Sequence, residues 1–568
     1  MLIWSFLALA LCAELFRMIR SVEVTDEIHG IASIINIIQG QKPIVSSWDY
    51  HTGWCLLAPF YSLFIALNHG SREGIVLFSR TLFLAFGILI IGFTAYLMRK
   101  TEKSAVSPAV LGVIAWVPFS IFQLNYNSLT VYLLLLGTVL IQCSNSKYMW
   151  FVSGVVFGLA CINYPTIAGA VLLITVIIAV AGNNGRRKAG IFFSGVAATG
   201  IIFTAWILIG VSPDAIKAGI AGMLSSPHEA NKESAGLEYI KITFADPLLA
   251  FARTGSLIFP FTVIQAVLAI AAKRYPYNRV LKLLPVFIYS AYVIFISYYY
   301  MESKGMVFFS AALYISSLVW VVFDQWVRAR DLIPYYLITT LFSVTYGFTS
   351  DNMNFLLGLM CCNVITAFAS IMALSSWFEN SGKEVQDREF SLETEERRLL
   401  CFILSMLLFV IPGIACGYSY VYRDRAVSSL NTKVEEGVFK GLYTTADREE
   451  MVVEMEHVIR QQTSKDDTMC VVTREPMLYV MSEAQICSPQ TWDPQFLSRG
   501  YTSAEPLLSY YEMLDRGYPD VMAATNSAPE DFFQNDEYEI KAFIDSNYEQ
   551  YYMKNVHGNT LCLWRSIE

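Results

Sequence analysis

Three residues that can donate or accept protons lie close together in the stretch SVEVTDEIHG, which follows the first apolar run of the chain. They are Asp26, Glu27 and His29. A carboxylate held beside a hydroxyl can remove its proton, and histidine can do the same near neutral pH. The stretch is therefore a candidate site for general acid–base chemistry. In the simpler interpretation, Asp26 and Glu27 only complement the dipole of a helix that begins here.

The spacing of the residues that follow predicts a helix from Thr25, its expected N-cap, to about Gln39. Polar or small residues recur every three or four positions, and an apolar stripe runs beside them. Such a helix is expected to lie along a membrane surface with its polar stripe facing a water-filled site. The polar stripe is Asp26, His29, Ser33, Asn36 and Gly40, and the apolar stripe is Ile28, Ile31, Ile35 and Ile38.

Further polar residues are expected to join this site from other loops. The segment GQKPIVSSWDYHTGW adds Asp49 and His51, and a second long loop adds His228 and Glu229. Together with Asp26, His29 and His51 of the first loop, these two residues could complete a site for a divalent metal ion, although the spacing specifies none. Asp351, in GFTSDNMNFLLG, could bind a polar ligand, but a helix N-cap explains that segment equally well.

The elements that must position these residues are membrane helices. The chain has 568 residues, of which 55% are hydrophobic and 15% are charged, with a mean hydropathy of +0.45. Soluble domains carry about 25% charged residues. We therefore expect a polytopic α-helical membrane protein with about thirteen transmembrane helices, the first of them retained. The expected spans are residues 2–18, 81–98, 107–123, 127–143, 149–164, 166–182, 190–211, 250–271, 283–300, 305–324, 332–348, 353–375 and 399–420.

The run 53–70 is apolar but shorter, and we expect an interfacial or re-entrant helix there. With this run left out of the count, most Lys and Arg residues of the short links fall on one face, which the positive-inside rule makes cytoplasmic. The outer face then carries the loops 19–80 and 212–249 and the C-terminal residues 421–568. Counting 53–70 as a span would move only the first helix and the first loop, and Arg17 and Arg20 favour that version.

The C-terminal residues 421–568 differ in character from the membrane region 1–420. Helical patterns such as DREEMVVEMEHVIRQQ and PLLSYYEMLDRG alternate with strand-like runs such as TMCVVT and PDVMAAT, and two strands are expected around HGN. This alternation predicts a small extracytoplasmic α/β domain with a supporting or substrate-shaping role. A disulfide among Cys470, Cys487 and Cys562 is left open. Nothing in the composition indicates a nucleic-acid partner.

The order of motifs near the N-terminus resembles the C superfamily of membrane glycosyltransferases (GT-C). A first span is followed by the acidic pair Asp26–Glu27, by Gly-x-x-Pro at 40–43, by an aromatic segment with Asp49, by an interfacial helix, and by Arg80 opening the second span. The branch of the lipid A aminoarabinose transferase and the protein O-mannosyltransferases is the most similar. The helix number and the outer C-terminal domain extend the resemblance to the whole chain. The aminoarabinose branch has Lys-Pro-Pro after its aromatic segment, where this chain has YHTGW, so the sugar and its acceptor are left open.

This resemblance implies an inverting transfer of a sugar from a polyprenyl-phosphate donor, without a nucleotide cofactor, to a hydroxyl of a cell-envelope glycan, lipid or protein. It implies that Asp26 is the general base, with Glu27 beside it. The leaving phosphate needs positive charge or a divalent metal. Arg80 and Arg253 are candidates for that charge, although each could simply extend its charged end to the membrane interface. The other predicted substrate-binding residues are His29, Asp49, His51, His228, Glu229 and Asp351.

Two other functions fit parts of the sequence. A transporter or flippase of a lipid-linked sugar would place ionisable groups deep in its helices and often shows two matching halves. Here the ionisable groups crowd into the outer loops instead. A non-catalytic envelope assembly protein would act through its outer domain, and Asp26 would then have no chemical role.

Overall fold

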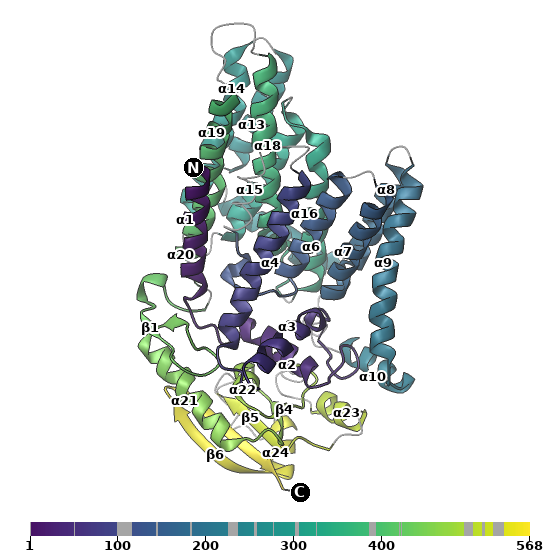
Figure 1. Ribbon diagram of the computed structural model, residues 1–568, viewed down its shortest axis with the longest axis vertical. Helices are drawn as coiled ribbons and strands as arrows, with labels where there is room; N and C mark the ends of the chain where they lie inside the picture. The colour runs from purple at the N-terminus through teal and green to yellow at the C-terminus, as the bar shows by residue number, and fades with distance from the viewer. Residues whose placement is uncertain are drawn as a thin grey trace.

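The structure is a computed structural model that describes residues 2–49, 51–98, 116–143, 146–181, 184–224, 237–254, 258–275, 278–300, 306–324, 326–350, 352–384, 394–419, 421, 423–492, 504–513, 517–525 and 539–567. A bundle of long helices forms one end of the molecule, and a small sheet with its own helices forms the other (Figure 1). Two short helices, α2 (Asp26–Ile38) and α3 (Trp54–Leu67), lie between these two parts.

The bundle is built from the apolar runs of the sequence. Shorter elements connect its helices, among them η1 (Pro118–Ser120), η2 (Pro165–Ile167), α10 (Pro213–Leu224), α11 (Leu237–Ile240), η3 (Lys241–Ala245) and α12 (Asp246–Thr254). The bundle helices are α1 (Leu2–Met18), α4 (Ile75–Met98), α6 (Ser128–Cys143), α7 (Lys147–Asn163), α8 (Ala168–Val180), α9 (Gly185–Leu208), α13 (Ile258–Arg274), α14 (Arg279–Tyr300), α15 (Met306–Phe323), α16 (Ala329–Thr349), α17 (Phe355–Cys361), α18 (Asn363–Glu384) and the continuous α19 (Thr394–Ser405), η4 (Met406–Val410) and α20 (Ile411–Ser419).

Among the described residues, 4 helices are long and apolar enough to cross a membrane, or 5 when α17 and α18 are taken as one span bent by 62°. Shorter apolar helices accompany them. Twelve of the predicted spans are helical over most of their described length. The polytopic helical architecture is therefore confirmed, whereas the count of about thirteen spans stays a prediction.

The remaining predicted span, 107–123, is wrong over its C-terminal end, because residues 116–127 are not α-helical. Pro118 lacks an amide hydrogen, and Phe119 and Ser120 adopt left-handed φ values of 54° and 58°, which an α-helix does not accept. The segment is largely buried. Non-helical backbone at this depth is tolerated where protein surrounds it.

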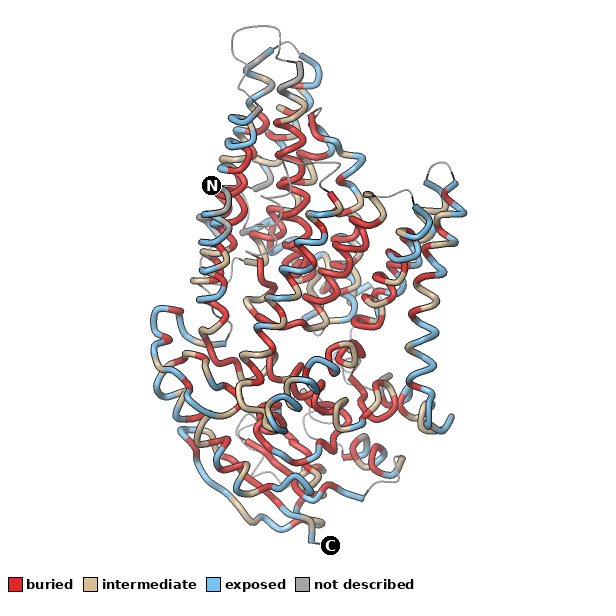
Figure 2. Tube along the Cα trace, in the orientation of Figure 1, coloured by how far each residue is buried: buried red, intermediate tan, exposed pale blue. Residues whose placement is uncertain are grey.

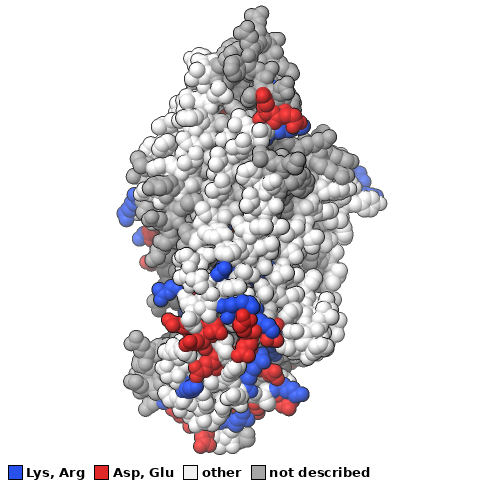
Figure 3. All heavy atoms as spheres, turned by 60° about the vertical axis from the view of Figure 1, so that its left-hand side comes forward, with Lys and Arg blue, Asp and Glu red and all other residues white. Residues whose placement is uncertain are grey.

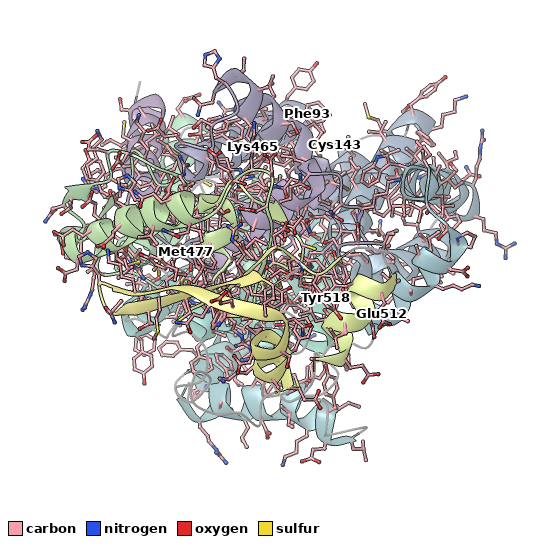
Figure 4. The ribbon with its side chains drawn as sticks, turned by 90° about the horizontal axis from the view of Figure 1, so that it is seen from below. Phe93, Cys143, Lys465, Met477, Glu512 and Tyr518 are labelled. Atoms are coloured by element: carbon pink, nitrogen blue, oxygen red, sulfur yellow. The ribbon has the colours of Figure 1, made fainter. Side chains whose placement is uncertain are left out.

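Large apolar side chains cover the flanks of the bundle. Leu89, Phe93, Val180, Ile201 and Ile202 are exposed there, on α4, α8 and α9. Figure 2 shows exposed positions along the outward sides of these helices, and Phe93 lies toward the edge of the molecule seen from below (Figure 4). Contiguous exposed apolar surface of this kind indicates contact with lipid.

The C-terminal region contains a five-stranded mixed sheet in the order β4-β3-β5-β7-β6. β3 pairs in parallel with β4 and β5, while β7 pairs antiparallel with β5 and β6. The predicted alternation of helices and strands, and the two strands around HGN, are confirmed. Figure 4 shows β6 and β7 crossing this end of the molecule, with α21 beside them and α23, which carries Glu512, near Tyr518. The elements are η5 (Val427–Ser429), β1 (Thr432–Lys433), β2 (Tyr443–Thr444), α21 (Ala446–Gln462), β3 (Thr468–Val471), α22 (Met477–Met481), β4 (Gln485–Ile486), α23 (Glu505–Met513), β5 (Val521–Thr525), α24 (Glu539–Asn547), β6 (Tyr548–Val556) and β7 (Asn559–Ser566).

Cys470 and Cys562 carry free thiols and lie with Cys487 in the buried core on one face of this sheet. Here they act as small apolar side chains.

The first loop and the C-terminal region are joined by backbone hydrogen bonds and by an arginine side chain. The amide of Tyr443 donates to the carbonyl of Ile19 at 2.8 Å, and the amide of Trp48 donates to the carbonyl of Pro489 at 2.8 Å. The Arg72 guanidinium donates to the carbonyl of Tyr479 at 3.0 Å. These bonds link loop 19–80 to residues more than 400 positions later, so the two segments fold as one layer beneath the bundle.

Within the bundle, α7 and α9 approach closely through two glycines. A Cβ atom built on Gly154 would lie 1.9 Å from the carbonyl oxygen of Phe192, and one built on Gly195 would lie 2.3 Å from that of Phe151. Small residues at such positions let membrane helices come into backbone contact. Gly190, on the same helix as Gly195, faces open space, since a Cβ built there meets no described atom within 4 Å.

Gly195→Ala is expected to lower the free energy of unfolding by about 1–3 kcal/mol, because α7 and α9 must separate to admit the methyl group. Gly190→Ala is expected to leave stability unchanged or to raise it slightly, because alanine favours the helix. The thermal midpoints of the purified proteins in detergent measure both effects. Equal midpoints for the two variants would contradict the close approach of these helices.

Candidate functional site

The start of α2 is held by a buried carboxylate that precedes it. Glu23 accepts hydrogen bonds from the amide of Glu27 at 2.6 Å and from the amide of Thr25 at 2.9 Å. Thr25 occupies the predicted N-cap position. Among the described residues, however, its side chain accepts no hydrogen bond from an amide of the helix, so the predicted capping bond is wrong. The longer side chain of Glu23 reaches the first turn instead.

Glu23 is expected to titrate near neutral pH. Burial raises the pKa of Glu23 to about 7, and the nearby charge of Asp26 adds to this. The hydrogen bonds from Thr25 and from the Glu27 amide lower the pKa, but by less.

Glu27 and Arg80 form a buried, two-point ion pair between α2 and α4. Arg80 donates from Nε to Glu27 Oε1 at 2.7 Å and from Nη2 to Oε2 at 2.6 Å, and each side chain is only 2% exposed. The same guanidinium donates to the carbonyl of Met18 at 2.8 Å and to that of Arg20 at 3.1 Å. Arg80 therefore fixes the end of α1, the start of α2 and the start of α4 relative to one another. It does not simply extend to the interface.

Asp26 lies one residue before this pair but faces the other way. Its carboxylate is 30% exposed, and Asp26 Oδ2 lies 3.6 Å from Nη2 of Arg423, which follows the last bundle helix. The Arg423 guanidinium also bonds to the hydroxyl of Thr25 and lies 5.7 Å from the ring centre of Trp492. Asp26 is thus a partly accessible carboxylate beside a cation.

His29 and Asp49, predicted to share a site, are in contact. His29 Nε2 lies 3.4 Å from Asp49 Oδ2, and Nδ1 lies 3.1 Å from the hydroxyl of Thr491. Asp49 also accepts hydrogen bonds from the Trp54 indole at 2.8 Å and from the amide of His51 at 2.9 Å. Burial alone would raise the pKa of Asp49, but the hydrogen bond and charge of His29, with His51, hold it well below its usual range. Asp49 therefore stays ionised and orients His29.

An aromatic wall lies beside these polar groups. The His51 ring stacks on Tyr126 with centres 3.6 Å apart and planes within 2°, and Trp54 and Trp492 lie against His29. Burial raises the pKa of Tyr126 well above its usual value, and the neighbouring Tyr346 and Asp26 add to this. The phenol therefore stays protonated, next to the charge of Asp26.

The polar stripe of α2 is only partly open to water. Ser33 and Asn36, expected to face water, are buried beneath the C-terminal region, where the Ser33 hydroxyl meets that of Thr491 at 2.7 Å. The expectation of a fully water-facing stripe is therefore wrong at Ser33 and Asn36, while Gly40 at its end is exposed. The cause is the docked C-terminal region, which contributes its own polar partner.

Several predicted site residues lie elsewhere or outside the described residues. Arg253 is exposed near the end of α12. The side chain of Asn354 accepts from the amide of Leu356 at 3.0 Å, which confirms the N-cap interpretation of that segment. His228, Glu229 and Asp351 lie outside the described residues. In the described part of the chain, no three His, Cys, Asp or Glu side chains gather as metal ligands, so a metal site stays a prediction.

Sequence reasoning missed the residues that the C-terminal region and the non-helical segment supply. Arg423, Thr491 and Trp492 come from beyond the last span, and Tyr126 comes from a segment predicted to end one helix and begin another. A signal was present for Arg423, because RDR at 423–425 places two arginines just beyond a membrane helix. No comparable signal marks Thr491.

Arg80→Ala is expected to lower the free energy of unfolding by about 3–5 kcal/mol, because it leaves Glu27 charged and buried without a partner. Arg253→Ala, which removes an exposed arginine, is expected to change it by less than about 0.5 kcal/mol. Denaturation in detergent micelles measures both. An Arg80→Ala protein as stable as wild type would contradict the structural role and favour a role in substrate binding alone.

Glu23 predicts a pH dependence of stability. Its folded-state pKa of about 7 lies above the usual glutamate pKa of 4.5, so the folded protein binds this proton more tightly than the unfolded chain. Stability is therefore lost as pH rises between these two values. Glu23→Gln cannot ionise, and its thermal midpoint is expected to fall less than that of wild type between pH of about 5 and about 8. Glu73→Gln, which removes a partly exposed acid of the same loop, serves as the control. Equal falls for wild type and Glu23→Gln would refute the assignment.

Comparison with known proteins yields one structural similarity. The crystal structure of ArnT from Cupriavidus metallidurans bound to undecaprenyl phosphate aligns over 98% of this chain and 97% of that one, with a TM-score of 0.45 and 12% sequence identity. Proteins at this level of similarity need not share a function. No family model matches the sequence, and no curated protein is similar to it.

Proposed function

We propose that the chain is an inverting glycosyltransferase that moves a sugar from a polyprenyl-phosphate donor to a hydroxyl of a cell-envelope glycan, lipid or protein. The reaction takes place on the outer face of the cell membrane, where the distribution of Lys and Arg along the sequence puts loop 19–80 and the C-terminal region. Asp26 is the general base.

The accessibility of Asp26 carries this proposal. Four acids gather around the start of α2, and three of them are buried: Glu23 caps the helix, Glu27 binds Arg80, and Asp49 binds His29 and Trp54. The fourth, Asp26, pairs with Arg423 at the surface. Asp26 is the most exposed of the four, with 30% of its side chain open to solvent. A general base must reach the proton that it removes, so accessibility favours Asp26.

The chemistry needs one carboxylate and one cation on this surface. An Asp26 oxygen accepts the proton of the acceptor hydroxyl while that hydroxyl oxygen attacks the anomeric carbon of the donor sugar. The bond from that carbon to the phosphate oxygen breaks, the electron pair leaves with the polyprenyl phosphate, and the configuration inverts. Positive charge near the phosphate stabilises the leaving group.

The surroundings of Asp26 fit a sugar that arrives attached to a lipid. Trp492, Tyr126 and His51 are partly exposed aromatic rings against which the apolar face of a sugar can pack, and His29 with Asp49 supplies oriented polar groups. The site lies at the end of an apolar bundle, where a donor with its tail in the bilayer presents its head group. Glu27 and Arg80 act here by holding α2 in place.

Asp26→Asn is expected to lower transfer by about 10²- to 10⁴-fold while the protein still folds and inserts, because an amide cannot accept the hydroxyl proton. Mass spectrometry of envelope glycans from cells with wild type, Asp26→Asn or no copy of the gene identifies the sugar that disappears. Asp214→Asn, which alters an exposed acid of the second outer loop, is expected to retain the sugar. An unchanged glycan profile in cells with Asp26→Asn would exclude Asp26 as the base.

A further inference from the structure

A cleft of about 340 Å³ opens in the C-terminal region beside the candidate site. Three arginines line it: Arg423 and Arg425, just beyond α20, and Arg448 in the first turn of α21. Arg423 belongs to both places, because it lines the cleft and also lies 3.6 Å from Asp26. A ligand in the cleft would therefore lie next to the proposed base.

The acids of the cleft leave part of this positive charge uncompensated. Asp424 is turned inward: its side chain is 2% exposed and accepts from the amides of Val22 and Arg425 at 2.9 and 2.8 Å. Asp447 is exposed and opposes the arginines from the first turn of α21. The guanidinium of Arg425 is exposed and has no partner among the described residues, so it can take a new one.

The surface above the cleft is apolar. The cleft lies at the foot of α1 and α20, which touch each other where the Arg17 guanidinium packs against Gly417. Leu9, Leu15 and Phe16 of α1 and Ile411 of α20 are exposed along this pair. Figure 3 shows this side of the molecule, where a middle surface with few charged side chains lies between a small charged group near the top and a larger cluster of both signs below. An apolar flank above a basic cleft fits an amphiphile with a long apolar tail and an anionic head.

We infer that this cleft binds the phosphate of the lipid-linked donor, with Arg423 and Arg425 as its ligands and the tail lying along α1 and α20. The inference rests on the proposed function for the identity of the lipid. Arginine suits the role because its planar fork of donors matches phosphate oxygens. Phosphate in the cleft competes with Asp26 for Arg423, so donor binding releases the carboxylate at the moment when a base is needed. Arg423 is thus a positioning residue for Asp26 as well as a ligand.

Binding of polyprenyl phosphate in detergent micelles to the full-length protein tests this, measured by calorimetry, with inorganic phosphate and neutral polyprenol as separate arms. Arg425→Ala is expected to weaken polyprenyl phosphate binding about tenfold, because one charge-assisted contact is lost. Asp447→Asn is expected to tighten it about two- to fivefold, because a like charge is removed. Arg565→Ala, which alters another exposed arginine of the C-terminal region outside the cleft, is expected to leave it unchanged.

Equal affinity of wild type and Arg425→Ala for polyprenyl phosphate would overturn the inference. The inference would also be overturned if inorganic phosphate bound in an Arg425-dependent way and polyprenyl phosphate bound no more tightly than inorganic phosphate. The cleft would then be a site for a water-soluble phosphate. If neutral polyprenol bound as tightly as polyprenyl phosphate, the cleft would not recognise the phosphate, and the inference would be overturned. These measurements report binding and not sugar transfer, so they separate the two proposals. Binding that does not depend on Arg425, with glycans that still change in Asp26→Asn cells, would refute the cleft alone. Binding that depends on Arg425, with unchanged glycans in Asp26→Asn cells, would refute only the proposed base.

Discussion

The ion pair between Glu27 and Arg80 is the interaction on which the candidate site depends. Removing two charges from water is costly, and that cost is offset only when geometry and hydrogen bonding are nearly complete. Here both carboxylate oxygens are engaged, and the guanidinium also satisfies the carbonyls of Met18 and Arg20. One residue thereby joins the first two bundle helices to the short helix that carries Asp26. Because Glu27 fixes the start of α2, the side chain of Asp26 can face outward while the helix stays in place.

The two acids of the DE pair thus have opposite tasks because successive residues of a helix point in different directions. Glu27 turns inward, toward α4 and the non-helical segment whose Gln123 bonds to its carbonyl at 2.6 Å. Asp26 turns toward the C-terminal region. The segment 116–127 is part of this arrangement, since a Cβ on Gly30 would lie 2.8 Å from the Gln123 amide and would push that buried side chain away. The break after Pro118 brings Gln123 and Tyr126 under α2.

Much of the fold follows from composition and periodicity. Long apolar runs become helices because the backbone N–H and C=O groups find no hydrogen-bond partners in lipid and must bond to one another. The helix–strand alternation after residue 421 can also be predicted from the sequence. Within the site, the helix over residues 26–38 and the meeting of His29 with Asp49 follow from short-range spacing and a shared loop. The partners that Asp26 and His29 take from the C-terminal region do not. Arg423 and Thr491 reach the site through backbone pairing between segments hundreds of residues apart, which no local pattern records. The left-handed turn at Phe119 could not be predicted either. A run of apolar residues predicts a helix, and nothing in the residue types shows that the backbone takes a left-handed conformation there.

The bond between His29 and Thr491 joins residues 462 positions apart, and this has a consequence for biosynthesis. A chain made from its N-terminus presents the acidic loop first and the last strands of the sheet long afterwards, with every bundle helix inserted in between. Throughout that interval His29 has Asp49 beside it in the chain but lacks Thr491, and Asp26 lacks Arg423. Contacts of such long range form late, after the local helices. A chain that ends before Thr491 therefore lacks the C-terminal partner of His29, so the candidate site is complete only when nearly the whole chain has been made.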